Sequence, residues 1–531
     1  MAKHIPPFVD GDLALANRVT AGWLNSVNEY IYGPPGVIGD GVTDDTAAMN
    51  AAIAQLQVTG GGVIQLPPGK FKITGTLLFT WPNATGNEAM GRVVLRGAGS
   101  GITTLLDYRP GSPTGGLVSY DMTAYPDNSY RYLYSWTGGF SIHRMVNQTL
   151  VGVGPYSITP GTGIGLYLAN MVSGEFRDLE IQGHNIAVKA LNCLGNAYND
   201  SSFGGADIGM YLSAATLPPG NTSPPNAVEV NHCTMNICKT AGIDIVHGGV
   251  GISGCSFSFD GIGGTNAGAI RFKADTIINK GLTVDTCMFE SNSGKGDVYI
   301  DALTAAAKTA VQVSNCTFVR NLGTAAVTPN PTNNIQVESS ATSEVDLSVF
   351  SCGFGQFNTP SVSTKFIGFT GAGAANTRAV LTGNAYNNTV ESPVAGGAST
   401  AELIVGRSQW QNVLGNYYGY INPGTDVIGS TTYGTLDISN VAKYHEAFGL
   451  LPITDNARYL GYPTYRWASA SIGIVFFGAA GDAGVYSGTG SPEGVVAAAV
   501  GSLYTNRSGG ASTTLYVKTS GTNTATGWTA K

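Results

Sequence analysis

The chain has 531 residues, enough for several domains or for one long solenoid. Only 11% of the residues are charged, 43% are hydrophobic and 74 are glycine, a turn-rich composition that is typical of all-β proteins and excludes a disordered chain. The net charge is −7 and no run of Lys or Arg occurs, so we expect no nucleic-acid partner. No apolar run of about 18 residues exists, so we expect no membrane span, and residues 1–10 lack the apolar region of a secretion signal.

The first predicted element is a helix over residues 10–31. Asp10 or Asp12 would cap its start, and apolar residues recur in it at spacings of three and four. Because such a helix is too short to be stable alone, we expect it to pack on a partner copy or on the next domain. The apolar positions are Leu13, Ala16, Val19, Trp23, Val27 and Tyr30.

A second helix is predicted to begin at Thr43, which would cap it. Asp44 and Asp45 would lie in its first turn, and the glycines at 60–62 would end it. Residues 63–73 are then predicted to form a strand, a turn and a strand, and residues 93–99 another strand and turn. The residues expected on the buried face of this helix are Met49, Ala52, Ile53 and Leu56.

The glycine- and aspartate-rich motifs around these elements resemble a known family signature. The motifs are GDGVTDDT at 39–46, GGGVIQLPPG at 60–69 and LRGAG at 95–99. Together they resemble the N-terminal signature of the pectate-lyase-like superfamily, above all its bacteriophage tailspike branch. The resemblance implies a right-handed parallel β-helix. Asp40, Asp44 and Asp45 would build the cap and turns rather than carry out chemistry.

A repeat containing cysteine is the main signal in the middle of the chain. In each unit alternating apolar residues lead into a polar corner, and a cysteine and then a Phe or Met follow, with intervals of 22, 32, 29 and 36 residues between cysteines. Periods of this size predict a solenoid whose coils stack on one another. The five residues are Cys233, Cys255, Cys287, Cys316 and Cys352. We expect a stack of inward-facing thiols rather than disulfides or a metal site.

The same pattern predicts which side chains face outward. Positions four and two residues before each cysteine, and one after it, should point to solvent. The first of these columns is Glu229, Gly251, Thr283, Gln312 and Ser348. The second is Asn231, Ser253, Asp285, Ser314 and Phe350.

Several carboxylates gather over these coils and suggest hydrolysis of a glycan. Glycosidic hydrolysis needs two carboxyl groups, and Asp260 and Glu290 would have Cα atoms about 8 Å apart, which suits an inverting pair. Glu229 and Asp285 would be about 12 Å apart. The alternative is that these carboxylates cap turns or pair with Lys or Arg at the surface.

A second set of strands between the cysteine strands supplies another column. It contains Gly209, Asp244, Arg271, Tyr299 and Gln336. Asp244, Arg271 and Tyr299 would hold a sugar, with Tyr299 as a stacking platform, and Gln312 and Asp285 are further candidates for binding. Arg271 would equally serve as an ion-pair partner of Asp244. Asp260 and Glu290 are the leading catalytic pair, and the further catalytic candidates are Glu229, Asp244 and Asp207, the last of which lies one residue before its strand.

We therefore divide the chain into five regions. Residues 1–32 would form an N-terminal helical segment, 33–110 the cap and first coils, and 111–375 the β-helix body. Residues 376–446 would form a β-rich connection, and 447–531 a C-terminal β module for trimerisation or receptor binding. The overall prediction is an all-β right-handed parallel β-helix with a short N-terminal helix and a C-terminal β module.

The resemblance to tailspikes implies a function. It implies a homotrimer in the virion, attached to the phage tail or baseplate through the N-terminal segment, assembled in the host cytoplasm and acting at the host cell surface. Such a spike would bind and hydrolyse a bacterial capsule, O-antigen or exopolysaccharide, with no cofactor and no metal. The alternatives are a polysaccharide lyase, a glycan deacetylase and a receptor-binding spike without enzymatic activity.

Overall fold

The computed structural model describes part of the chain. It covers residues 30–531 except 60, 81–89, 92, 123–130, 134–135, 147–148, 151–157, 215–225, 247, 263–267, 275–280, 321–332, 357–365, 373–376, 383, 388–393, 397–402, 407–408, 412–416, 419–434, 439–441, 446–448, 453–473 and 477–482. The helix predicted over residues 10–31 thus lies outside the described residues, apart from its last two, which belong to strand β1 (Tyr30–Tyr32). The chain divides into two compact units, residues 1–451 and 452–531.

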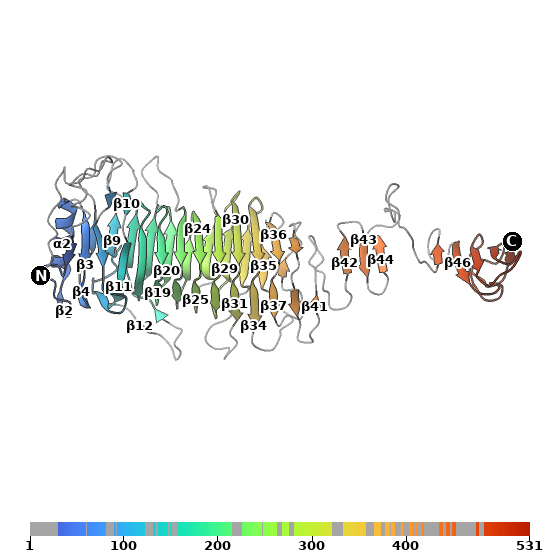
Figure 1. Ribbon diagram of the computed structural model, residues 1–531, viewed down its shortest axis with the longest axis horizontal. Coiled ribbons are helices and arrows are strands. Elements are labelled where there is room, and N and C mark those ends of the chain that lie inside the picture. The colour runs from blue at the N-terminus through green and yellow to red at the C-terminus, as the bar shows by residue number, and fades with distance from the viewer. Residues whose placement is uncertain are drawn as a thin grey trace, which may run out of the picture. The chain divides into compact units, whose positions relative to one another are not determined.

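The first unit is a parallel β-helix, as the sequence predicts (Figure 1). Each regular coil contributes three strands, which stack on the corresponding strands of neighbouring coils as a first, a second and a third ladder. A 25-stranded sheet contains the first and second ladders, and an 11-stranded sheet forms the third. The connections between parallel strands have the right-handed sense that such crossovers take.

The strands of the three ladders are as follows. The first ladder contains β1, β3 (Gly62–Gln65), β7 (Val93–Arg96), the first parts of β11 (Trp136–Arg144) and β16 (Glu175–Gln182), β18 (Ala197–Asn199), β21 (Val228–Asn231), β24 (Gly249–Ser253), β27 (Gly281–Asp285), β30 (Lys308–Ser314), β33 (Glu344–Phe350), β36 (Thr377–Thr382) and β39 (Leu403–Gly406). The second contains β2 (Asp40–Asp44), β4 (Gly69–Ile73), β8 (Thr103–Asp107), the last parts of β11 and β16, β19 (Ser202–Gly204), β22 (Thr234–Asn236), β25 (Ser256–Ser258), β28 (Met288–Glu290), β31 (Thr317–Arg320), β34 (Gly353–Gln356), β37 (Ala385–Asn387) and β40 (Gln409–Gln411), with β41 (Tyr417–Tyr418) antiparallel to β40. The third contains β5 (Leu77–Phe79), β9 (Gly116–Asp121), β14 (Ile164–Ala169), β17 (Ile186–Leu191), β20 (Ile208–Ser213), β23 (Ala241–Ile245), β26 (Gly268–Lys273), β29 (Gly296–Ala302), β32 (Ile335–Ser339), β35 (Ile367–Thr370) and β38 (Val394–Gly396).

Smaller sheets accompany the ladders. They are β6 (Met90–Gly91) with β10 (Arg131–Leu133) and β15 (Met171–Val172), then β12 (Thr149–Leu150) with β13 (Ile158–Thr159), and β42 (Thr435–Ile438) with β43 (Ala442–His445) and β44 (Gly449–Pro452).

The cysteine repeat forms the corner between the first and second ladders. All five repeat cysteines are free and buried, which confirms the prediction of an inward thiol stack. The residue before each cysteine has a left-handed backbone, with φ between 52° and 62° at His232, Gly254, Thr286, Asn315 and Ser351. This conformation turns the chain sharply, so that the side chains on both sides of the corner point into the core.

A stack of aromatic rings lies beside the thiols. Phe257, Phe289, Phe318 and Phe354 follow one another at centroid distances of 4.9, 4.7 and 4.7 Å, with planes within 7° of parallel. Each ring buries its faces against the coil before and the coil after it. Coil-to-coil contact of this kind makes the body stable as an array, and no coil has a complete core by itself.

The cap helix α2 (Thr46–Thr59) begins three residues later than predicted. The carboxylate of Asp40 accepts hydrogen bonds from the backbone N–H groups of Val42 and Thr43, which holds this segment in a turn of β2. Asp45 binds the N–H groups of Ile38 and Gly39 instead of lying in the first turn of the helix. Met49, Ala52, Ile53 and Leu56 form the buried face, as predicted.

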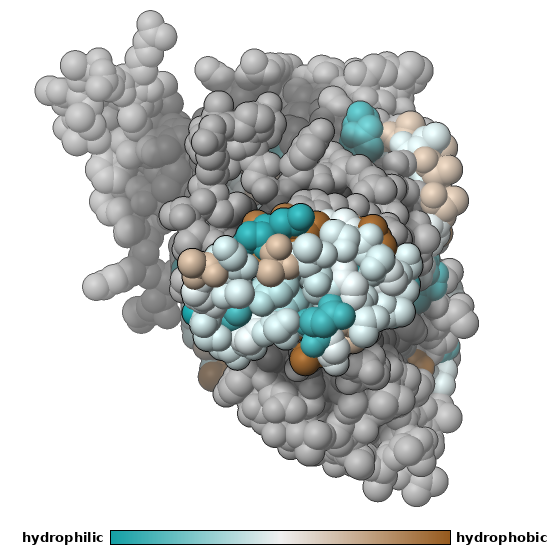
Figure 2. Space-filling view, turned by 90° about the vertical axis from the view of Figure 1, so that its right-hand side faces the viewer, coloured by the Kyte–Doolittle hydropathy of each residue, from teal (hydrophilic) through white to brown (hydrophobic). Residues whose placement is uncertain are grey.

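The described part of the second unit contains a five-stranded sheet. Its strands are β45 (Ile474–Phe476), β46 (Gly484–Gly488), β47 (Leu503–Asn506), β48 (Leu515–Lys518) and β49 (Trp528–Ala530). Tyr486, Tyr504, Tyr516 and Trp528 pack together as its core, so these aromatic rings are not free to stack on a sugar. The face of this unit seen in Figure 2 is mostly of intermediate hydropathy, with small and separate apolar areas.

Candidate functional site

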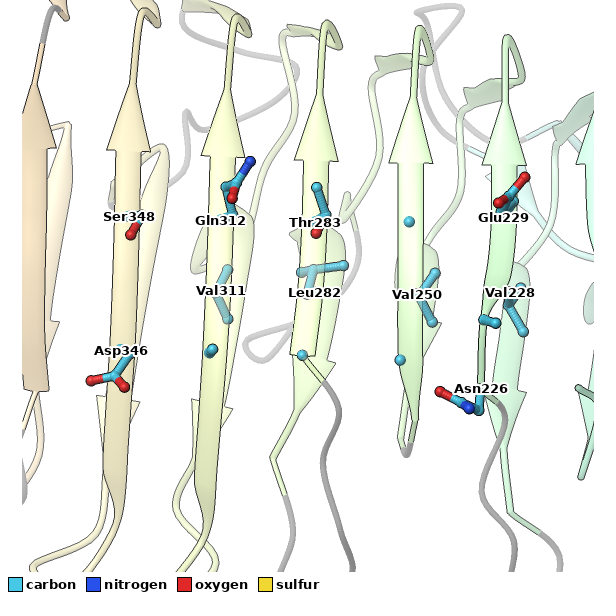
Figure 3. Close-up of a pocket in the computed structure, with 15 residues that line it drawn as sticks. Asn226, Val228, Glu229, Val250, Leu282, Thr283, Val311, Gln312, Asp346 and Ser348 are labelled. Carbon is cyan, nitrogen blue, oxygen red and sulfur yellow. The ribbon is translucent and has the colours of Figure 1, made fainter. Parts of the chain in front are cut away.

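A shallow groove crosses the outer face of the first ladder. It has a volume of about 440 Å³ and runs over five successive strands, β21, β24, β27, β30 and β33. Glu229 and Asp346 lie at its opposite ends (Figure 3). The groove therefore runs along the stacking direction of the coils, which is the direction in which a long polymer would lie.

Two outward columns of side chains make the groove. The register aligns Glu229, Gly251, Thr283, Gln312 and Ser348 across five coils, as the sequence predicts. The neighbouring column, two residues earlier in each strand, contains Gly249, Gly281, Ala310 and Asp346. Three of these four residues have at most a methyl group, and this missing bulk hollows the face.

Gly251 lies in the floor of the groove, and the fold does not account for its lack of a side chain. A Cβ atom at this position would meet no atom within 4 Å, and its φ angle is not in the left-handed region. Glycine inside a strand weakens the strand and often marks a place where a ligand approaches the backbone. Gly281 differs, because its φ of 98° itself favours glycine.

Glu229 and Gln312, both predicted site residues, line the groove and are exposed. Asp346 also lines it but was not predicted, because the pattern was followed only to five residues before each cysteine. Asp346 is six residues before Cys352, so extending the alternation by one residue would have found this position. The groove thus contains two carboxylates, and no Lys or Arg is among its described lining residues.

A third carboxylate continues the Glu229 column on the preceding coils. Glu175 is in register with Ala197, and Ala197 with Glu229. Glu175 was missed because its coil has Leu179, and the next has Ser201, where the later coils have cysteine. The apolar residues Phe176, Leu179 and Ile181, which are buried, were the signal that could have marked the phase of this coil.

Asp260 is not part of a surface pair with Glu290, which corrects the expected geometry. Asp260 is completely buried, and its Oδ1 accepts a hydrogen bond of 2.8 Å from the backbone N–H of Cys238. Burial raises the pKa of Asp260 to about 8. Glu290 is half-buried on β28 and lies in register with Ser258. The chain turns inward after β25, so the outward alternation does not extend to Asp260.

Asp260 begins a buried polar chain that links three coils. The Asn292 side chain accepts from the backbone N–H of Asp260 and donates to Asp297, with an Nδ2–Oδ1 distance of 2.9 Å. Asp297 also accepts from Asn334, whose side-chain oxygen in turn accepts from Arg320 at 3.0 Å. Burial raises the pKa of Asp297 to about 6. These groups hold the coils together and do not face solvent.

In the column on the third ladder, the polar side chains bind other protein groups and are not open to a sugar. Asp244 is 1% exposed and forms a bidentate pair with Arg271, with N–O distances of 2.8 and 2.6 Å. This confirms the ion pair that the sequence left as an alternative. Tyr299 is 1% exposed and donates its hydroxyl to Glu338, so its ring is not a stacking platform, and burial raises its pKa.

The remaining predicted residues also have local partners. Asp207 accepts a hydrogen bond of 2.6 Å from the Thr240 hydroxyl. Asp285 accepts from Ser314 at 2.6 Å and from Asn315 at 2.9 Å, and these bonds lower its pKa. Both arrangements tie one coil to the next.

Another buried charged cluster lies between the early coils. Asp107 binds Arg109 at 2.7 Å, Arg144 at 3.0 Å and His184 at 3.1 Å, and all four residues are at most 3% exposed. The hydrogen bonds from His184 and Arg109 outweigh burial and lower the pKa of Asp107. Within the described part of the chain, no group of His, Cys, Asp and Glu fits a metal ion, and no helix is long and apolar enough to cross a membrane.

Comparison with known proteins supports the predicted superfamily. Residues 35–268 match the family described as rhamnogalacturonase A/epimerase, pectate lyase-like, which confirms the resemblance seen in the N-terminal motifs. Among curated proteins, mannuronan C5-epimerase AlgE1 of Azotobacter vinelandii is 50% identical over 40 residues. This alignment covers 8% of the present chain and 3% of the relative, so the chain spans only a small part of it.

Solved structures also include similar chains. ORF18 of Geobacillus virus E2 has a TM-score of 0.44 and 14% identity, and the alignment covers 94% of this chain and 86% of the ORF18 chain. The gp42 tailspike of Acinetobacter phage vb_AbaP_AS12 has a TM-score of 0.43 and 11% identity, and the alignment covers 84% of this chain and 87% of the gp42 chain.

Proposed function

We propose that the protein binds a bacterial surface polysaccharide in the groove of the first ladder and cleaves it by hydrolysis. The observation that carries the proposal is the groove itself, about 440 Å³ along five coils with Glu229 at one end. Gly251 leaves room on the floor for a sugar ring, and Thr283 and Gln312 offer hydrogen bonds to hydroxyl groups. Glu229 is the predicted catalytic residue that lines this space.

The charge of the groove favours hydrolysis over lyase chemistry. A lyase acts on a uronic acid, whose carboxylate has to be neutralised, and the described lining residues include Glu229 and Asp346 but no cation. A substrate carboxylate 5 Å from Glu229 would be repelled by about 3 kcal/mol at an effective dielectric constant of 20. Lys308 lies nearby but pairs with Glu344 at 2.9 Å. A neutral glycan therefore fits the groove best.

The setting of this activity is a phage tailspike. The motifs at 39–46, 60–69 and 95–99 resemble the tailspike branch of the superfamily. Residues 35–268 match the family model described as rhamnogalacturonase A/epimerase, pectate lyase-like. On this proposal the protein is a homotrimer attached to the phage tail through residues 1–32 and acts at the host cell surface. Residues 447–531 would serve trimerisation or receptor binding.

The test is to incubate the purified protein with a panel of neutral and acidic bacterial polysaccharides and to follow chain length and absorbance near 232 nm. We expect a neutral polysaccharide to be shortened without new absorbance. Glu229→Gln should lower turnover at least 100-fold, since one catalytic carboxyl group is lost. If Glu290→Gln abolished turnover and Glu229→Gln did not, the site would lie on the second ladder.

A groove variant separates substrate exclusion from misfolding. Gly251→Thr copies the residue at the same position of the next coil, Thr283, and suits a strand better than glycine does. We expect unchanged or higher thermal stability together with weaker binding and slower cleavage. Full activity in a folded Gly251→Thr protein would contradict the proposed groove.

A second candidate is lyase or epimerase chemistry on a uronate polymer. The sequence similarity to the mannuronan C5-epimerases favours it. Shortened acidic polysaccharide with new absorbance near 232 nm would support a lyase. Binding without any shortening would instead support a receptor-binding spike or a deacetylase. Release of acetate would identify the deacetylase.

A further inference from the structure

Two carboxylates of the first ladder face the same strip of surface across a gap. Glu175, Ala197 and Glu229 occupy one outward column on three successive coils. With coils about 4.8 Å apart, the Cα atoms of the two glutamates are about 9.6 Å from each other. The residue between them in this column is Ala197, whose side chain is only a methyl group.

We propose that Glu175 is the second catalytic carboxylate and acts with Glu229 in an inverting hydrolysis, an inference that rests on the proposed function. Inverting glycosidases separate their carboxyl groups by about 6.5–9.5 Å, which leaves room for a water molecule beside the sugar. The carboxyl groups of Glu175 and Glu229 would fall within this range if both side chains lean toward Ala197 when substrate is bound. The closer spacing of a retaining pair, about 5 Å, would need residues on adjacent coils.

The surroundings assign the two roles. Arg177 Nη1 lies 3.6 Å from Glu175 Oε1, so a hydrogen-bond donor stands beside the carboxylate that takes the proton from water. Glu229 borders the groove, which would hold the leaving part of the polymer and so bring the glycosidic oxygen next to Glu229. Glu229 is therefore the acid and Glu175 the base.

The reaction balances with these two residues and one water molecule. Glu229 gives its proton to the glycosidic oxygen as the bond between that oxygen and the anomeric carbon breaks. The water oxygen bonds to the anomeric carbon from the opposite face, and Glu175 takes a proton from this water. The products are two shorter chains, and the new reducing end has the inverted configuration.

A cluster next to Glu175 keeps Arg177 in place. The indole of Trp136 lies between two guanidinium groups, 3.9 Å from that of Arg177 and 4.2 Å from that of Arg96. Trp136 is also in register with Glu175. With both faces of its ring covered, Trp136 holds Arg177 beside Glu175 and is not itself a platform for sugar.

The test uses Glu175→Gln, Glu229→Gln and the matched control Glu344→Gln, on a panel polysaccharide that the unmodified protein shortens. Glu344 lies on the same ladder, is exposed and is ion-paired with Lys308, but does not line the groove. We expect turnover to fall at least 100-fold in the first two variants and to stay unchanged in the control. Proton NMR of the first product should show the inverted anomer. Sodium azide should restore turnover in Glu175→Ala and yield a glycosyl azide.

The outcomes separate the two proposals. If no panel polysaccharide is shortened, the proposed function fails and this inference fails with it. If the unmodified protein cleaves a glycan but Glu175→Gln retains its turnover, only the role of Glu175 is refuted. A product of retained configuration would also refute the inverting pair. Thermal unfolding of each variant identifies any loss of turnover that comes from unfolding.

Discussion

The first and third ladders use acidic side chains in opposite ways. On the first ladder, Glu229 is exposed beside Gly251, and no partner for its carboxylate is found among the described residues. On the third ladder, Asp244 is buried and bound twice by Arg271. Both residues occupy repeat positions that the sequence assigns to the surface. The counterpart on the next coil is a glycine for Glu229 and an arginine for Asp244.

This comparison shows where function can be located in a stacked fold. A side chain on one coil always faces its counterpart on the next, about 4.8 Å away. A large or charged counterpart covers or neutralises it, whereas glycine or alanine leaves it available. Availability to a ligand is therefore a property of columns of residues rather than of single residues.

The largest effect that we predict concerns the buried carboxyl group of Asp260. Its pKa of about 8 in the folded protein lies above 3.8, so the folded state binds a proton that the unfolded state has lost between these two pH values. Stability from this group is thus fully present below pH 3.8 and decreases as the pH rises to about 8. At roughly 1.4 kcal/mol per unit, the loss over the window is on the order of 5 kcal/mol.

Asp260→Asn should remove most of this pH dependence, because the amide stays neutral. The measurement is the free energy of unfolding by urea between pH 4 and 9. The control is Asp200→Asn, since the Asp200 side chain is 71% exposed. Asp297, with a pKa of about 6, would leave a smaller slope below pH 6 in both proteins. Equal slopes for Asp260→Asn and the unmodified protein would contradict the raised pKa of the buried Asp260 carboxyl group.

The next effect tests the third ladder directly. Asp244→Ala leaves the Arg271 guanidinium, whose side chain is 24% exposed, without its partner. Removing one member of a buried pair costs about 3 kcal/mol of unfolding free energy. Because the pair does not line the groove, the folded variant should cleave or bind glycan as before.

The matched control is an exposed pair on the first ladder. Lys308 and Glu344 have side chains that are 69% and 60% exposed, so Glu344→Ala should cost less than about 0.5 kcal/mol. Urea unfolding of the two variants compares them. If Asp244→Ala lost glycan binding while still folded, the third ladder would be part of the site after all.

The fold could be predicted from the sequence because its determinants are repeated. The cysteine, the Phe and the valines recur in phase, and each depends on stacking against its own counterpart, so one rule covers many coils. The same rule predicted that Gln312 and Glu229 face outward, and both line the groove. The rule failed at Asp260, because the chain turns inward beyond β25 and alternation no longer indicates direction.

The partners of the site residues could not be predicted in the same way. Arg271 was considered both as a sugar ligand and as an ion-pair partner, and only the register of β23 with β26 and the side-chain distances decide between them. Glu175 was missed because its coil has no cysteine to mark the phase. Loop lengths vary from coil to coil, so the distance along the chain does not identify which residues are neighbours in space.

The smallest effect on glycan binding that we predict tests a single hydrogen-bonding group of the groove. Gln312→Ala removes an exposed amide that lines the groove, and one hydrogen bond to a sugar is worth about 0.5–1.5 kcal/mol. We therefore expect binding of the glycan to weaken by about 2- to 10-fold, with no change in thermal stability. Thr317→Ala is the control, since Thr317 is exposed on the second ladder of the same coil and outside the groove. Isothermal titration calorimetry measures the glycan affinity of both variants in the Glu229→Gln background, in which the glycan is cleaved slowly. Equal weakening by the two substitutions would mean that the polymer lies across both ladders rather than along the first, because only a chain crossing the cysteine corner contacts both side chains.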